Sequence, residues 1–367
     1  MSTIQVLSPN LVNKIAAGEV IERPASVVKE LMENSIDAGA MRIDVSVEQG
    51  GLDLMRVSDD GGGIAADELA LAVASHATSK IRDADDLFRV QTLGFRGEAL
   101  ASIAAVSRLV LRSRTARSQA GAQLEIAGGG PAEISPCASP IGTTIEVRQL
   151  FYNTPVRRKF LRSTQTEMGH LTEAFTRIAL ANPHVQCTLA HNGRSLYDLP
   201  ATDDWRLRIA TFFGDDLAAD LIEVSSSDEG VYLRGHAASP SHSRANPRLQ
   251  YLFLNGRAIR DRSLQHALGE AYRGLLLTGR YPIAFLRIEM PSEQVDVNVH
   301  PTKLEVRFQE SGRLYSQLLG TLRTKFLSTD LTARLQPVTS EAAAAIDPAR
   351  AEAVRRELVD WAKGQLS

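Results

Sequence analysis

The pattern of apolar and polar positions changes several times between strand-like and helix-like in the first half of the chain. Two-residue alternation predicts strands at 42–47, 54–58, 109–114, 123–126 and 143–147, and helical periodicity predicts helices at 69–76, 98–105 and 167–181. The last helix is expected to end before Asn182-Pro183, because proline disfavours helical backbone at the residue before it. Strands clustered after helices favour an α+β layered domain over a doubly wound parallel sheet.

A second series of elements begins near residue 203. Strands are expected at 231–237, 250–254, 285–289 and 295–299, with a helix at 264–273. Beyond about residue 335 the chain becomes polar and rich in alanine, which is typical of a linker. We therefore predict one domain at 1–202, a smaller α/β domain at 203–335, and the start of an interdomain linker at 336–367.

The segment around residues 28–38 carries its oxygen-bearing side chains at helical spacing. Glu30, Asn34 and Asp37 fall on one face of the expected helix, and the small and apolar positions fall on the other: Val28, Leu31, Met32 and Ser35. A carboxylate, an amide and a second carboxylate could deprotonate a water molecule and bind a hard cation. For this segment alone, an ordinary solvated helix face is the alternative.

Composition narrows the class of protein. The 367 residues are 44% hydrophobic and 23% charged, with a formal charge of -2, as in ordinary globular proteins. Nucleic acid could then be bound only through a local basic surface. The two cysteines, Cys137 and Cys187, lack metal-ligand spacing and fit a reducing compartment. Neither a secretion signal nor an apolar run of the ~20 residues that span a bilayer is present, so we expect a cytoplasmic protein.

Glycines mark three further places where a ligand could approach the backbone. Asp59-x-Gly61-x-Gly63 follows a predicted strand, and the aspartate could accept a hydrogen bond from the exocyclic amine of adenine. The loop at 94–100 runs from Gly94 into a helix, whose exposed amides could cradle an anion. Hydroxyls at 75–80 and 142–144 also suit phosphate oxygens. Ordinary turns and polar surface are the alternatives, and a P-loop is excluded because its motif does not occur.

Together these segments resemble the motifs of the GHKL (Bergerat-fold) ATPases. The resemblance is greatest to the MutL family of DNA mismatch repair ATPases, and it extends over about residues 4–335. The strings that carry it are 15–21, 23–31, 94–102, 151–155 and 295–308. One departure is Asp60, where the family is expected to have asparagine. The resemblance implies an α/β sandwich ATPase domain followed by a smaller α/β transducer domain, with a C-terminal dimerisation domain beyond residue 367.

The resemblance also implies roles for individual residues. Glu30 would be the general base, Asn34 would hold Mg2+, and Asp59 would bind adenine. The other residues expected at ATP are Asp37, Ala38, Gly61, Gly63, Ile64 and Thr143, with Thr78, Ser79, Lys80, Leu93, Gly94, Phe95, Arg96, Gly97, Glu98, Ala99 and Leu100 in a lid. Lys303 of the second domain would reach the γ-phosphate.

The function implied is slow, Mg2+-dependent ATP hydrolysis that controls a nucleotide-driven lid and a homodimer. The arm at 4–21 would cross to the partner subunit. The partners implied are DNA, a mismatch-recognition protein and a downstream repair nuclease or helicase, with association with the nucleoid during repair. Endonuclease activity would belong to a C-terminal part and stays open. A topoisomerase-type ATPase subunit and a non-catalytic DNA clamp with a vestigial nucleotide site are the alternatives.

Two basic clusters are candidates for contact with DNA phosphates. Between residues 244 and 273 there are six arginines (244, 248, 257, 260, 262 and 273) against two acids, Asp261 and Glu270. The DNA-binding residues that we predict are Arg157, Arg158, Lys159, Arg162, Arg260, Arg262 and Arg273. Such contacts would be independent of sequence and sensitive to salt. Arginine on a solvated helix is the alternative.

Overall fold

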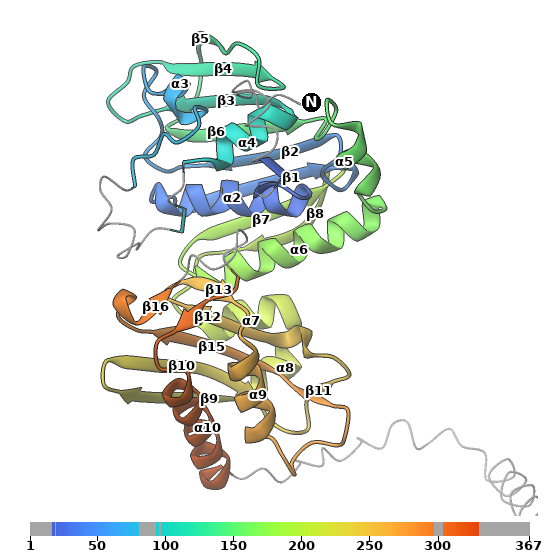
Figure 1. Cartoon of the computed structure of the whole chain (residues 1–367), viewed down its shortest axis with the longest axis vertical. Coiled ribbons are helices and arrows are strands. Elements are labelled where there is room, and N and C mark those ends of the chain that lie inside the picture. Colours follow the sequence, from blue (N-terminus) through green and yellow to red (C-terminus); the bar gives the residue numbers. More distant parts are fainter. Residues whose placement is uncertain (1–16, 19, 81–92, 95–96, 297–303, 330–367) are drawn as a thin grey trace, which may run out of the picture. The chain divides into compact units, whose positions relative to one another are not determined.

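An eight-stranded sheet forms the first layer of the computed structural model, which describes residues 17–18, 20–80, 93–94, 97–296 and 304–329 (Figure 1). Its strands are β1 (Arg42–Glu48), β2 (Leu54–Asp59), β3 (Arg108–Arg114), β4 (Gly121–Ala127), β5 (Glu133–Cys137), β6 (Gly142–Arg148), β7 (Gln186–His191) and β8 (Arg194–Leu199). Their spatial order is β5-β4-β3-β6-β2-β1-β7-β8. All neighbours pair antiparallel except β1 and β7, which are parallel.

Helices cover one face of this sheet and leave the other face polar. The covering helices include α2 (Pro24–Asp37), α4 (Ala99–Val106) and α6 (Thr164–Ala181), which lie before the strands in Figure 1. Along β1, the fully or nearly fully buried Ile43, Val45 and Val47 enter the core, while Asp44 and Ser46 alternate with them. The result is the two-layer α/β sandwich that the sequence predicts. Shorter helices are α3 (Leu69–Ala72) and α5 (Pro155–Phe160).

A five-stranded sheet forms the second part, in the order β13-β12-β15-β10-β9. Its strands are β9 (Leu221–Asp228), β10 (Val231–Ala238), β12 (Gln250–Leu254), β13 (Arg257–Ile259) and β15 (Ala284–Glu289); its helices are α7 (Trp205–Phe213), α8 (Asp215–Ala219), α9 (Arg262–Ala271) and α10 (Ser311–Ser328). Short strand pairs join β11 (Ser243–Arg244) to β14 (Tyr281–Pro282), and β16 (Val295–Asp296) to β17 (Arg307–Phe308). Aromatic rings of Tyr251, Phe253 and Phe285 stack in its core.

Arginines of the second part bind backbone carbonyl groups of the first part, at the end of α6 and in the segments after it. Arg208 of α7 is 1% exposed, and its guanidinium donates to the carbonyl oxygens of Ala179, Pro183, Val185 and Pro200. Burial lowers the pKa of Arg287 to about 10, and this guanidinium also donates to the Leu180 carbonyl at 3.0 Å. The carbonyls of Ala179 and Leu180 lie in the last turn of α6, where they have no acceptor role within the helix, so the arginines satisfy them.

Most of the expected elements are confirmed, with differences at their ends. The helix expected at 69–76 stops as α3 at Ala72, and His76 lies in a turn at φ 62°. The helix expected at 167–181 begins earlier, at Thr164, because the hydroxyl of Ser163 caps the amide of Thr166. The helix expected at 264–273 is α9, displaced toward the N-terminus by its cap Asp261. Of the strand expected at 295–299, only Val295–Asp296 lies within the described residues.

Residues Met1–Thr329 form one compact unit by their contacts, so the domain boundary at 202 stays a prediction. The expected linker at 336–367 lies outside the described residues. Within the described ranges, none of the helices combines the length and apolar character needed to cross a bilayer.

Candidate active site

The helix α2 presents its polar stripe to the site because its opposite face is fixed in the core. Pro24 occupies the first turn, where its missing N–H leaves no hydrogen bond unmade. Val28 and Met32 are fully buried, and Leu31 is 2% exposed. Glu30, Asn34 and Asp37 therefore line one side of the helix, as the spacing predicts.

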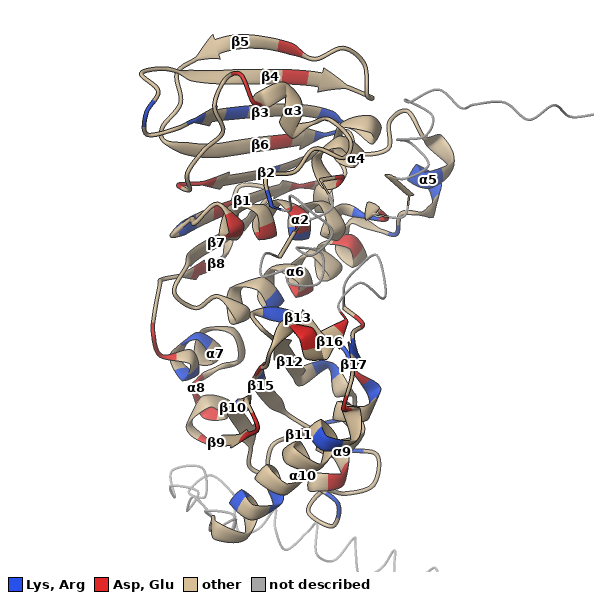
Figure 2. Cartoon of the chain, turned by 60° about the vertical axis from the view of Figure 1, so that its left-hand side comes forward, with Lys and Arg blue, Asp and Glu red and all other residues tan. Residues whose placement is uncertain are grey.

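Glu30 is 9% exposed, and its carboxylate accepts a hydrogen bond of 2.8 Å from Nζ of Lys29. The same ammonium lies 3.0 Å from Oε2 of Glu33. Burial by itself would lower the pKa of Lys29, but the charges of Glu33 and Glu30 outweigh it and raise the pKa. Lys29 thus stays charged and holds both glutamates in place. Figure 2 shows a basic position beside acidic ones on α2.

Lys80 brings the segment that follows α3 onto the end of α2. Its Nζ lies 2.9 Å from Oδ1 of Asn34 and 2.5 Å from Oδ2 of Asp37. The amides of Leu93 and Gly94 donate to the two oxygens of Asp37, at 2.9 and 3.0 Å. Three expected lid residues therefore converge on the stripe of α2.

The carboxylate of Asp59 lies at the end of β2 and is held by three donors. The hydroxyl of Ser35 lies 2.7 Å from Oδ2, and the amides of Gly61 and Thr143 donate to Oδ1 at 3.0 and 3.2 Å. Burial raises the pKa of Asp59, and the three hydrogen bonds counteract only part of that effect. The amide of Gly62 donates to the carbonyl of Ala38 at 2.9 Å, which joins this turn to the end of α2.

Two glycines are required by close backbone contacts around this site. Gly142 has a φ of 113°, and a Cβ there would lie 2.0 Å from the carbonyl oxygen of Asp59. Gly97 has a φ of 61°, and a Cβ there would lie 2.4 Å from the carbonyl oxygen of Ala77. Any side chain at either position would move the segments that surround Asp59 or the expected lid.

The remaining predicted residues lie around the same centre. Gly61 and Gly63 follow Asp59 in one turn, Ile64 donates its amide to Ser113 at 2.8 Å, and Thr78 accepts from the amide of Lys80 at 3.2 Å. Ser79 precedes Lys80 in that turn, and Glu98 directly precedes α4, which Ala99 and Leu100 begin. Phe95, Arg96 and Lys303 lie outside the described residues.

Three residues that contact this centre were not among the predicted site residues. Ser35 was placed with the packing residues, yet its hydroxyl reaches Asp59. Lys29 could have been found from its spacing of four to Glu33. Arg257 was counted only among the basic residues, yet it is 9% exposed and its Nη2 donates to the carbonyl of Leu93 at 3.0 Å. No sequence signal brings β13 to α2, since that contact depends on the packing of two sheets.

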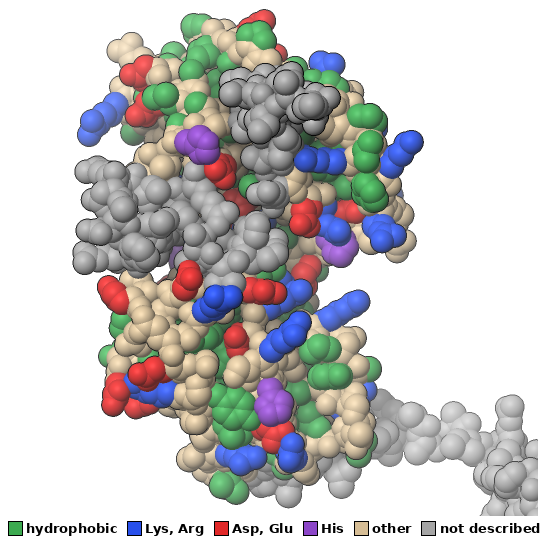
Figure 3. Space-filling model, in the orientation of Figure 1, with side chains coloured by type: hydrophobic (Ala, Val, Ile, Leu, Met, Phe, Trp, Pro, Cys, Tyr) green, Lys and Arg blue, Asp and Glu red, His purple; other side chains and the backbone are tan. Residues whose placement is uncertain are grey.

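The two basic clusters expected at DNA are separate in the chain and differ in their surroundings. Arg158, Lys159 and Arg162 are exposed on and after α5, whereas Arg157 is half-buried beside Gly18. In the second part, Arg260 and Arg262 are exposed, and Arg273 is paired with Glu270. The neighbouring charge of Arg177 lowers the pKa of Arg260. Figure 3 shows basic side chains around α5 and again over the second part.

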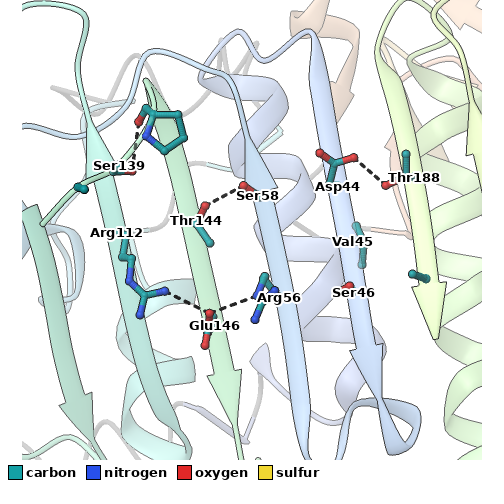
Figure 4. A pocket seen from close by; sticks show the side chains of 13 residues that line it. Asp44, Val45, Ser46, Arg56, Ser58, Arg112, Ser139, Thr144, Glu146 and Thr188 are labelled. Atoms are coloured by element: carbon teal, nitrogen blue, oxygen red, sulfur yellow. Dashed lines mark hydrogen bonds and ion pairs between the residues drawn. The ribbon is translucent and has the colours of Figure 1, made fainter. Parts of the chain in front are cut away.

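A hollow of 570 Å³ on the open face of the first sheet is a different place (Figure 4). It is lined by alternate residues of neighbouring strands, among them Asp44, Arg56, Arg112 and Glu146. The Glu146 carboxylate binds three guanidiniums, from Arg56, Arg112 and Arg148, at 3.2, 3.2 and 2.7 Å. Burial acts against these ion pairs, but together they lower the pKa of Glu146. None of the described residues predicted at ATP lines it.

The donors on α2 suit a hard cation. The amide oxygen of Asn34 already faces a positive charge, the ammonium of Lys80. Oxygen is the ligand atom that Mg2+ prefers, and Mg2+ commonly takes only one or two protein ligands beside phosphate and water. A Cβ on Gly94 would lie 3.3 Å from that amide oxygen, so the glycine also leaves room beside it. The residues present therefore fit a magnesium–nucleotide complex.

Two family models match the chain. The model described as "Histidine kinase-, DNA gyrase B-, and HSP90-like ATPase" matches residues 21–128, and the model described as "DNA mismatch repair protein, C-terminal domain" matches residues 209–327. The first match contains most of the residues predicted at ATP. The second covers most of the five-stranded sheet and its helices.

Curated relatives are about half identical to this chain over the aligned residues. The DNA mismatch repair protein MutL of Pseudomonas putida (strain W619) is 51% identical over 325 residues, which are 88% of this chain and 51% of the relative. MutL of Pseudomonas aeruginosa (strain LESB58) is 51% identical over 323 residues, 87% of this chain and 51% of the relative. The chain thus spans about half the length of the curated relatives it matches.

Solved structures agree with this similarity. The Aquifex aeolicus MutL ATPase domain complexed with ADP is 31% identical, with a TM-score of 0.58, and the match covers 74% of this chain and 93% of that one. A structure described as the N-terminal domain of a DNA repair protein is 25% identical, with a TM-score of 0.76, over 88% and 99% of the two chains. These matches confirm the expected GHKL ATPase fold.

Proposed function

Because the chain belongs to the MutL family of DNA mismatch repair proteins, we propose that it binds and slowly hydrolyses ATP to control engagement with DNA and repair partners. One observation carries the proposal. Glu30 and Asn34 share a face of α2, and two segments remote in sequence, at Lys80 and at Leu93–Gly94, converge on the end of that face. This arrangement supports a site that closes over a triphosphate.

Glu30 is the proposed general base. Its carboxylate can accept a proton from a water molecule and orient that water toward the γ-phosphate, because phosphoryl transfer depends mainly on positioning and charge. Asp59 is proposed to accept from the exocyclic amine of adenine, supported by the donors that fix its carboxylate. Ala38, Gly61, Gly63, Ile64 and Thr143 would surround the base and sugar.

Asn34 is the proposed protein ligand of Mg2+. When bound, the ion would neutralise charge that develops on the phosphates. Lys80 would exchange its present contacts with Asn34 and Asp37 for phosphate oxygens, together with Thr78 and Ser79. The amides of the loop at 93–100 would complete the lid. Lys303 is proposed to bring a charge from the second domain to the γ-phosphate.

Two further proposals concern partners. The basic residues at α5 and at Arg260, Arg262 and Arg273 are proposed to contact DNA phosphates without reading sequence. The arm at 4–21 is proposed to form an ATP-dependent homodimer, which sedimentation with a non-hydrolysable ATP analogue would test. A mismatch-recognition protein and a repair nuclease or helicase are the expected partners of the whole protein, in the cytoplasm and at the nucleoid.

Calorimetry and phosphate release test the proposed activity together. We expect wild-type chain to release phosphate slowly from ATP and only with Mg2+. The variant Asn34→Ala should lose the part of ATP affinity that depends on Mg2+ and keep the part measured in EDTA. ATP binding without any phosphate release would instead favour a non-catalytic clamp, and unchanged Mg2+-dependent affinity in the variant would contradict the ligand role of Asn34.

A further inference from the structure

Arg257 stands at the start of β13, directly after a tight turn. The turn residues Asn255 and Gly256 both have positive φ, 48° and 80°, and Leu254 pairs with Arg257 across the hairpin. Such a two-residue turn fixes the register of the hairpin rigidly. Since β13 packs against α6 of the first part, the turn directs Arg257 toward α2 and leaves it 9% exposed.

The guanidinium of Arg257 and the carboxylate of Asp37 hold the same short segment. Nη2 of Arg257 donates to the carbonyl oxygen of Leu93 at 3.0 Å. The amides of Leu93 and Gly94 donate to Asp37 at 2.9 and 3.0 Å. The segment is thus bound through its carbonyl by the second sheet and through its amides by α2. A displacement of β13 relative to α2 must either break one of these contacts or move the segment.

The charges around Arg257 belong to the proposed catalytic helix. Burial lowers the pKa of Arg257, and the negative charges of Glu33, Glu30 and Asp37 act in the opposite direction. An arginine remains protonated in such surroundings, so its positive charge faces the carboxylates of α2 permanently. A buried charge is costly unless it is paired. The carboxylates of α2 compensate the charge of Arg257, which distinguishes it from a solvated surface arginine.

We propose that Arg257 is a positioning residue that couples the second sheet to the Leu93–Gly94 part of the lid and to the acidic face of α2. The proposal rests on the proposed function of ATP hydrolysis. Arg257 keeps Leu93 and Gly94 on Asp37, so it determines how often these two residues lie against α2. Adenine binding is set elsewhere, at Asp59, whose donors are Ser35, Gly61 and Thr143. Arg257 therefore controls turnover more than nucleotide affinity.

The test compares Arg257→Gln and Arg257→Lys with a matched control. Arg280 is an exposed arginine of the same part of the chain whose Nη2 also donates to a backbone carbonyl, that of Ser243, at 2.6 Å. We expect Arg257→Gln to lower kcat at least about tenfold while the Kd of ADP changes less than about threefold. Arg257→Lys, which keeps the charge and one donor, should recover part of kcat. Arg280→Gln should behave as wild type.

Amide hydrogen exchange provides a readout that does not depend on catalysis. In the nucleotide-free protein, exchange at Leu93 and Gly94 should accelerate at least about tenfold in Arg257→Gln and stay unchanged in Arg280→Gln. Unchanged exchange at these two amides, or unchanged kcat in Arg257→Gln, would overturn the proposal. If Arg257→Gln does not fold, Arg257→Lys must show faster exchange at Leu93 and Gly94 and a lower kcat than wild type. Absence of hydrolysis in wild type would refute the proposed function, whereas the exchange result would still test this contact.

Discussion

Nζ of Lys80 lies 2.9 Å from Oδ1 of Asn34, so an ammonium from the expected lid faces the amide oxygen proposed to bind Mg2+. The same ammonium is 2.5 Å from Asp37, whose other donors are the amides of Leu93 and Gly94. Lys80 therefore neutralises the end of α2 in the present arrangement. In the proposed reaction the ammonium of Lys80 moves from Asn34 and Asp37 to the phosphate oxygens. Asn34 then becomes available for Mg2+.

Removing this ammonium should weaken ATP binding more than folding. Lys80→Met keeps the length of the side chain but loses a charged donor, and we expect the KM for ATP to rise about tenfold or more. The Kd of adenosine should be unchanged, because Lys80 makes no contact near Asp59. Steady-state kinetics and calorimetry check both expectations. An ATP KM equal to that of wild type would contradict the transfer of Lys80 to phosphate.

Asp59 offers a prediction in which binding and stability change in opposite directions. Asp59→Asn replaces one acceptor with a donor amide, so ATP and ADP affinity should fall at least about tenfold. At neutral pH the variant should nevertheless unfold at a higher temperature than wild type, because a buried carboxylate that must ionise has been removed.

The stability difference should depend on pH with a definite sign. Burial raises the pKa of Asp59 in the folded protein, so the folded state binds this proton more tightly than the unfolded chain. The stability that Asp59 contributes is present in acid and is lost as the pH rises through the raised pKa. The advantage of Asp59→Asn should therefore be largest near about pH 7 and shrink toward about pH 4. An advantage that grows with acidification would show that the pKa is lowered instead.

The proposed DNA contacts can be tested by charge reversal. Arg260→Glu with Arg262→Glu should reduce retention of duplex DNA at low salt and lower the slope of log K against log salt by about 2. The matched control is Arg234→Glu with Arg323→Glu, which makes the same change in net charge at exposed positions of the same part of the chain. If both double variants lost DNA binding equally, the loss would come from the change in net charge and not from these positions. Unchanged binding in the first pair would place the DNA surface elsewhere.

The sequence predicted the local elements of the site well because each depends on short-range spacing. The stripe of Glu30, Asn34 and Asp37 follows from helical periodicity, and it is fixed by the burial of Val28 and Met32 opposite. The position of Asp59 at a strand end, and of Gly142 at a strand start, likewise follows from alternation and glycine placement.

Contacts between remote segments could not be predicted in this way. Strands β7 and β8 complete the first sheet, yet β7 pairs parallel with β1 across a long stretch of chain, and no local pattern encodes that partner. Arg257 reaches Leu93 only because β13 packs on α6. The end of α3 was also predicted wrongly, because apolar spacing continues to His76 although the backbone turns after Ala72.

The most direct test of the central claim is the effect of Glu30→Ala on two quantities measured on one preparation. Calorimetry should give an ATP Kd within about threefold of wild type, because Asp59, Asn34 and the lid still bind the nucleotide. Phosphate release should fall by a factor of about a hundred or more, the usual contribution of a general base. Hydrolysis at the wild-type rate in this variant would contradict the account.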